Sequence, residues 1–305
     1  MPSVPSRWTQ PSVLALAKGR DPVEAVTERA REIVTEAMDR GWSGPPFDPL
    51  ALADILKIQV HAREDVRDAR TVPSEEGVPR IEYNPTRPRA RVRYSLAHEI
   101  AHTFFPDWAD EVRHRAEQYE LKGDDWQLEA LCNIAAAELI MPMGSFMGLA
   151  AVQLGIDDLL SEQKRFDTSM EALLIRAVHL RPEQCAIFCA SPVERGTHAG
   201  RYRIDYSIAS RSWKIERTIR GLLLPQDTIV ASCSAIGFTA KGRESWSTDM
   251  EVRVEAVGIP PYPGSASPRV VGLLLPLLAG VPTHPELIEF ILGDATKPFG
   301  DGRKM

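Results

Sequence analysis

The chain has 305 residues, of which 44% are hydrophobic and 26% are charged, and its formal net charge is −6. This composition excludes a disordered chain, and the length predicts two domains, each with a sizeable core. The negative charge argues against general nucleic-acid binding, which needs clustered lysine and arginine.

Residues 1–20 carry several prolines and little hydrophobic patterning, so we predict an N-terminal arm there. This segment lacks a basic region followed by an apolar block, and no secretory signal is expected. The longest apolar run, Val270 to Val281, is too short to cross a bilayer. The four cysteines lack the spacing of a metal knuckle, and free buried thiols fit a reducing compartment. We therefore expect a cytoplasmic protein that binds no membrane.

The first strong helix is predicted to begin at Asp21, a capping residue followed by proline and then Glu24. An apolar stripe follows at helical spacing and should form core: Val26, Ala30, Ile33, Val34 and Ala37. The stripe ends at Gly41, and a glycine-proline break follows.

Four arginines alternate between Arg87 and Arg93. On an extended segment these arginines would share one face. We interpret them as a solvated strand face in preference to a phosphate or substrate contact.

The run His98-Glu99-Ile100-Ala101-His102 has the H-E-x-x-H pattern of zinc hydrolases. On a helix, residues four apart stack on one face, so both imidazoles can bind one metal ion. Glu99 would lie at the edge of that face, where its carboxylate can take a proton from a metal-bound water. Apolar residues surround the motif at helical spacing, and Pro106 ends the run. An ordinary amphipathic helix with solvated polar residues is the alternative.

A catalytic zinc usually has three protein ligands. The next helix, predicted at 124–142, is mostly apolar, and its polar residues Glu129, Asn133 and Glu138 stand out. Glu129 and Asn133 share a face, whereas Glu138 points the opposite way. Between the two helices, His114 and Tyr119 are candidates for polarising a scissile carbonyl, with a solvated surface role as the alternative.

Three segments resemble signatures of the ImmA/IrrE family of metallo-endopeptidases. They are Arg93 to His102, Glu129 to Pro142, and Ser169 to Arg176. The resemblance covers about residues 45–180, and the departures from the family pattern are Tyr94, Ala101, Cys132 and Ala135. None of these departures touches a ligand position.

The resemblance implies a mainly helical zincin-like domain with a small sheet, which we place at residues 21–184. It implies that the metal ligands are His98, His102 and Glu129, and that Glu99 is the catalytic base. The metal would be Zn²⁺, although Mn²⁺ or another divalent ion suits such a site. Four residues are candidates for orienting the histidines: Asn133, Glu138, Asp124 and Asp125. The implied substrate is a protein, such as a DNA-binding helix-turn-helix repressor in a stress, mobile-element or defence response.

Residues 185–305 change character and predict a strand-rich α+β domain. Strands are expected around Cys185–Cys189, Tyr202–Tyr206, Ile229–Ile236, Glu251–Ala256 and Val270–Leu275. Short helices are expected at Trp213–Leu222 and Pro285–Leu292. This domain has no catalytic motif, and we hypothesise that it recruits the substrate or senses a trigger.

The sequence therefore predicts an α+β zinc endopeptidase that hydrolyses a peptide bond in a specific intracellular protein. The competing hypothesis is a non-catalytic zinc-containing module that sequesters a partner. Exchanging Glu99 for glutamine separates the two, because only an enzyme would lose its activity while keeping its metal.

Overall fold

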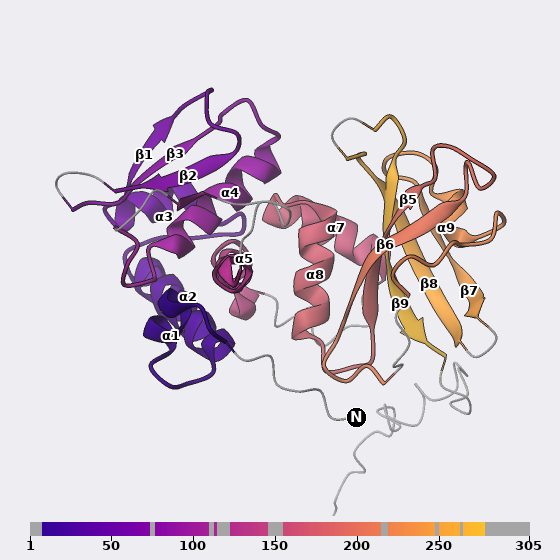
Figure 1. The fold of residues 1–305 in the computed structure, drawn as a ribbon, viewed down its shortest axis with the longest axis horizontal. Helices are drawn as coiled ribbons and strands as arrows, with labels where there is room; N and C mark the ends of the chain where they lie inside the picture. The colour runs from indigo at the N-terminus through magenta and orange to yellow at the C-terminus, as the bar shows by residue number, and fades with distance from the viewer. Residues whose placement is uncertain are drawn as a thin grey trace, which may run out of the picture.

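The computed structural model describes residues 8–73, 77–109, 113–114, 123–145, 155–214, 219–247, 250–262 and 265–277. Figure 1 shows a helical part with a small sheet at one end and a larger sheet at the other, with helices between them. The predicted α+β fold class is confirmed. No helix among the described residues is long and apolar enough to cross a membrane.

The described residues before 123 form four helices and a small sheet. The helices are α1 (Pro11–Ala17), α2 (Pro22–Asp39), α3 (Pro49–Ile55) and α4 (Arg89–His102). The strands are β1 (Gln59–Ala62), β2 (Ala69–Val72), β3 (Arg80–Tyr83) and β4 (Arg113–His114). The sheet order is β1-β3-β2-β4, with β1 parallel to β3 and the other pairs antiparallel.

Helix α2 begins as predicted, because the Asp21 carboxylate accepts hydrogen bonds from the amides of Val23 and Glu24 at 2.9 and 3.0 Å. Its apolar stripe is buried, as expected. The loose arm is wrong for the part of residues 1–20 that the structure describes. Helix α1 forms there, and its Val13 is 0% exposed within the main core.

Helix α4 begins at Arg89, so the predicted extended arginine segment is wrong. Each arginine that enters the helix meets a specific partner. Arg91 donates to both carboxylate oxygens of Asp68 at 2.7 and 2.6 Å. Arg93 is buried and donates to the carbonyl of Phe47 at 2.7 Å. These arginines hold α4 to neighbouring loops.

In the described part of the chain, three helices lie between the two sheets. They are α5 (Asp125–Ile140), α7 (Ile156–Phe166) and α8 (Met170–Leu180). Helix α5 packs against both α2 and α4, and it brings the second polar motif beside the first. Helices α7 and α8 lie between α5 and the larger sheet (Figure 1).

The larger sheet is antiparallel in the order β6-β5-β9-β8-β7. Its strands are β5 (Ala186–Pro192), β6 (Tyr202–Ala209), β7 (Thr239–Ser247), β8 (Met250–Ile259) and β9 (Arg269–Pro276). Alternate residues of β5 enter different cores: Ile187 and Cys189 join the core of the helices, whereas Phe188 joins a second core on the opposite face. Both faces of the sheet are therefore buried at β5.

Two polar contacts fix this sheet to the connecting helices. Arg269 of β9 donates to both carboxylate oxygens of Glu171 on α8 at 3.3 and 3.2 Å. The Glu255 carboxylate of β8 is 0% exposed and accepts a 2.8 Å hydrogen bond from the amide of Ile156 at the start of α7.

Three predictions for this region need correction. Residues 229–236 form no strand, because helix α9 (Ile229–Ser232) begins there, capped by the side chain of Thr228. Strand β7 was not predicted. The described residues around Trp213 and Leu222 are not helical, and the helix predicted at 285–292 lies outside the described residues.

Candidate metal centre

The H-E-x-x-H residues occupy the last turns of α4, and the two histidines lie on the face that packs against α5. His98 and His102 are each 0% exposed, and their ring centroids lie 5.0 Å apart at an interplanar angle of 72°. The four-residue spacing thus stacks the two imidazoles beside each other on one face of the helix, as the sequence predicts.

Glu129 reaches these rings from the second turn of α5. Its two carboxylate oxygens lie 3.1 Å from Nε2 of His98 and 3.4 Å from Nε2 of His102. Donors arranged tetrahedrally at about 2.0–2.1 Å from one ion lie roughly 3.3 Å from each other. The two imidazoles and the carboxylate therefore have the chemistry and the separations of a three-residue metal site.

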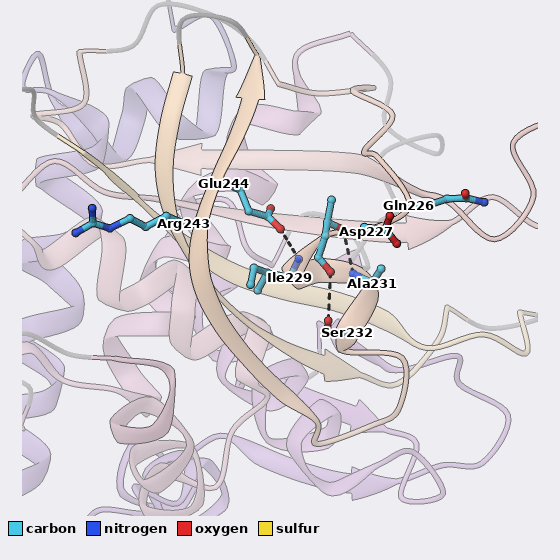
Figure 2. A pocket seen from close by; sticks show the side chains of 8 residues that line it. Gln226, Asp227, Ile229, Ala231, Ser232, Arg243 and Glu244 are labelled. Carbon is cyan, nitrogen blue, oxygen red and sulfur yellow. Dashed lines mark hydrogen bonds between the residues drawn. The ribbon is translucent and has the colours of Figure 1, made fainter.

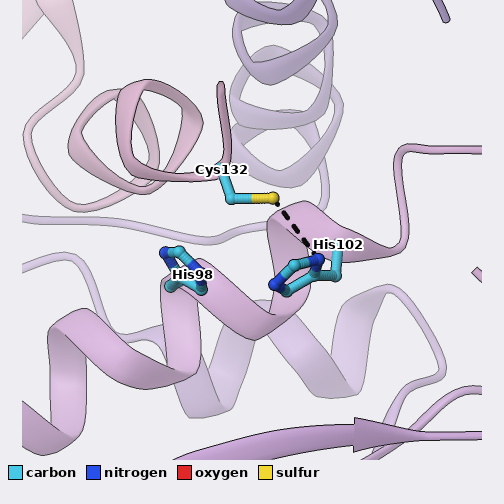
Figure 3. Close-up of side chains that lie close together, drawn as sticks. All are labelled: His98, His102 and Cys132. Carbon is cyan, nitrogen blue, oxygen red and sulfur yellow. Dashed lines mark hydrogen bonds between the residues drawn. The ribbon is translucent and has the colours of Figure 1, made fainter. Parts of the chain in front are cut away.

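The second nitrogen of each ring faces another residue of α5. Nδ1 of His98 lies 3.1 Å from Oδ1 of Asn133. Nδ1 of His102 lies 3.5 Å from Sγ of Cys132, as Figure 3 shows. Such contacts on the far side of a ligating imidazole orient the ring. The sequence placed Cys132 in the core, where it is buried, and gave no sign of this contact.

A second donor set is available in the same place. The ligand atoms of His98, His102 and Cys132 lie within 4.8 Å of one another and are all buried. Cys132 contacts Nδ1 of His102, whereas Glu129 lies beside Nε2 of both histidines at shorter distances.

Glu99 points away from α5 toward the small sheet. It is 0% exposed, and the hydroxyl of Thr71 on β2 donates to its Oε2 at 2.8 Å. The same hydroxyl lies 3.1 Å from the backbone carbonyl of Glu99. Thr71 is itself fully buried, so the sheet holds the carboxylate in place. Sequence reasoning missed Thr71, since a lone threonine in a short strand carries no functional signal.

The other predicted candidates lie elsewhere. Glu138 forms a buried ion pair with Arg176 of α8 and does not orient a histidine. Asp124 accepts a hydrogen bond from Thr9 at 2.9 Å, and Asp125 is exposed in the first turn of α5. His114 belongs to β4, paired with Arg70, but its side chain and all of Tyr119 lie outside the described residues.

A hollow of about 550 Å³ lies far from these residues, between α9 and β7 (Figure 2). Some of its polar groups already have partners in the fold. Glu244 accepts from the amide of Ile229, and Thr228 accepts from the amide of Ala231 at 3.2 Å. Because these two groups cap α9, the buried residues of α4 and α5 are the stronger candidate site.

Comparison with known proteins supports the resemblance seen in the sequence. Residues 54–178 match the model of the peptidase family Peptidase_M78, described as the IrrE N-terminal-like domain. A search of curated proteins gives no match. A solved structure described as a Mycobacterium tuberculosis transcriptional regulator is similar with a TM-score of 0.56 and 14% identity, covering 88% of this chain and 82% of that chain. At this identity the likeness concerns the fold alone.

Proposed function

Residues 54–178 form a metallopeptidase-type domain of the IrrE N-terminal-like family, and from this premise we propose that the protein is a metal-dependent endopeptidase. The observation that carries the proposal is the buried convergence of His98, His102 and Glu129 from two helices, at 3.1 and 3.4 Å. Three polar groups without a common task would be costly to bury together. Binding one cation gives them that task.

We propose that Zn²⁺ is the metal and that His98, His102 and Glu129 hold it. Two imidazoles and one carboxylate are a common ligand set of catalytic zinc, and Mn²⁺ or another divalent ion is also compatible with it. The bound metal would polarise the peptide carbonyl and make water acidic enough to lose a proton near neutral pH.

In this proposal Glu99 is the general base. Its carboxylate takes a proton from the attacking water and later delivers that proton to the leaving amine nitrogen. The hydrogen bond from Thr71 fixes the carboxylate that performs both transfers. His98 and His102 are buried, so their rings stay in one orientation while the substrate enters and the products leave.

We propose a specific cytoplasmic protein as the substrate, and the family resemblance suggests a helix-turn-helix repressor. Cleavage would then act on transcription through the partner. Residues 185–305 are proposed to recruit this substrate or to sense the signal that triggers cleavage. Their sheet contacts α8 directly, which gives it a physical route to the metallopeptidase domain.

The test is co-expression of the chain with the products of neighbouring genes, followed by a search for a protein fragment. We expect the fragment with the native chain and not with Glu99→Gln, whereas purified Glu99→Gln should keep its metal. Glu36→Gln makes the same chemical change on the exposed face of α2 and should cleave normally. If Glu99→Gln has the same effect on the partner as the native chain, the protein is a binding module and the proposal is wrong.

A further inference from the structure

A fully buried imidazole needs protein partners for both of its nitrogens. His98 is 0% exposed, so bulk water cannot supply one. A buried N–H without an acceptor costs about 1–3 kcal/mol. On the Nε2 side His98 faces Glu129, and on the Nδ1 side it faces Oδ1 of Asn133 at 3.1 Å.

The amide of Asn133 is itself held by a third residue. The hydroxyl of Tyr94 donates to Oδ1 of Asn133 at 3.1 Å and lies 3.3 Å from the backbone carbonyl of the same residue. Tyr94 precedes His98 by one turn of α4, so its ring lies along the same side of the helix. Tyr94 thereby contacts the same amide oxygen that faces Nδ1 of His98.

This arrangement favours one tautomer of His98 when a cation is bound. An amide oxygen accepts hydrogen bonds and cannot donate them. Because Oδ1 of Asn133 faces Nδ1 at 3.1 Å, the contact is favourable only when Nδ1 carries a proton. When a cation takes the place of a proton at Nε2, on the side occupied by Glu129, this contact keeps the remaining proton on Nδ1. That is the form of histidine that binds a metal through Nε2.

We propose that Tyr94 and Asn133 are positioning residues that hold the His98 imidazole in the tautomer whose Nε2 can bind the metal. The inference rests on the proposed function, since it assigns a role toward the same metal. Tyr94 matters here because the family signature has phenylalanine at this position. The hydroxyl is a feature of this chain and gives its asparagine a second, fixed partner.

His102 has a weaker partner at its Nδ1 than His98 has. The group facing its Nδ1 in the described structure is the thiol of Cys132 at 3.5 Å, and sulfur is a weak hydrogen-bond partner. We therefore expect changes on the His98 side to affect metal binding more than the loss of the Cys132 sulfur.

The test measures zinc affinity of the purified full-length chain by competition with a chromophoric chelator. Asn133→Leu removes the acceptor at similar volume and should weaken zinc binding about 10–100-fold, the usual effect of losing such a partner. Asn133→Asp keeps an oxygen in place and should retain affinity within a few-fold. Tyr94→Phe removes only the hydroxyl and should weaken binding by a smaller factor, about 2–10-fold.

Gln127→Leu is the matched control, because Gln127 is also a buried amide of α5 but bonds to the backbone of Thr9 and Gln10. It should lower stability without changing zinc affinity. The second readout is the ¹⁵N spectrum of the zinc-loaded protein, in which the signal of the hydrogen-bonded Nδ1–H of His98 should be present in the native chain and lost in Asn133→Leu.

The outcomes separate the two proposals. If the native chain binds zinc tightly but Asn133→Leu binds equally well and keeps the Nδ1–H signal, the positioning role is wrong and the proposed enzyme stands. If the native chain itself does not bind zinc, the proposed metal centre fails first. If Gln127→Leu weakens zinc binding as much as Asn133→Leu, the effect is general destabilisation of α5, and the positioning role is again rejected.

Discussion

Removal of Arg176 should destabilise the protein strongly, although this residue is remote from the histidines in sequence. Its guanidinium pairs with Glu138, and the side chains are 7% and 1% exposed. Arg176 also donates from Nε to the carbonyl of Met141 at 3.1 Å. The pair joins the end of α5 to α8, and burial lowers the pKa of Arg176 against the opposing effect of the Glu138 charge.

In Arg176→Met, the Glu138 carboxylate stays buried without its main counter-charge. Breaking a buried pair in this way costs about 3–5 kcal/mol. Arg31 lies 3.6 Å from Glu138 but is 49% exposed, and the amide of Met143 donates to Glu138 at 2.9 Å. Because of these contacts, we expect a loss near the lower end of that range, about 3 kcal/mol. This is a large part of the total free energy of unfolding of a typical protein, about 5–15 kcal/mol.

Urea unfolding monitored by circular dichroism measures this loss, and a double-mutant cycle with Glu138→Leu isolates the coupling. We expect Glu138→Leu/Arg176→Met to be more stable than the sum of the two single losses by about 2 kcal/mol or more, because no charge is left buried. Losses that simply add, or a loss below about 1 kcal/mol for Arg176→Met, would contradict the assignment of a coupled buried pair.

Two further predictions concern Thr71 and the buried thiols. Thr71→Val should lower kcat of the cleavage reaction about tenfold with little change in KM or zinc content, because it removes a hydrogen bond to the Glu99 carboxylate. Thr71→Ser should restore the rate, and failure of this rescue would argue against the hydrogen bond as the cause. Burial raises the pKa of Cys189 to about 12 and that of Cys233 to about 11, so both thiols should resist iodoacetamide at pH 8 until urea unfolds the chain. In the unfolded chain both thiols would return to a pKa of about 9 and lose their protons above that pH. The contribution of the two thiols to stability should therefore fall as the pH rises above about 9. Labelling of the native chain as fast as that of the unfolded chain would refute the burial of these thiols.

The nearness of His98, His102 and Glu129 could be predicted from the sequence because it depends mainly on local geometry. Residues 98 and 102 are four apart, so they share one face of any helix that contains both. The family resemblance indicated Glu129 on the next helix. Asn133 shares the face of Glu129, so its place beside His98 also follows from helical spacing. The partner of Glu99 did not follow, because Thr71 reaches it across 28 residues of sequence through a strand pairing that no local pattern specifies.

The errors came from patterns that two structures satisfy equally well. Arginines at alternate positions fit a strand face, yet Arg89 to Arg93 enter a helix because partners such as Asp68 and Asp167 compensate them from elsewhere in the chain. The first helix was missed for a similar reason. It is held by distant contacts, including Ser12 to Asp107 and the stacking of Trp8 on Trp126, and a local window shows neither.

The larger sheet has consequences for how the chain can be divided experimentally. Because Ile187 and Cys189 belong to the same core as the helices, a chain cut after residue 184 would present an apolar helical surface to water. Such a fragment would be prone to aggregation, and its inactivity would reveal nothing about recruitment or sensing. Substitutions on the solvent-facing loops of the sheet leave this shared core intact. They are therefore the sounder way to test the sheet for a role in regulation.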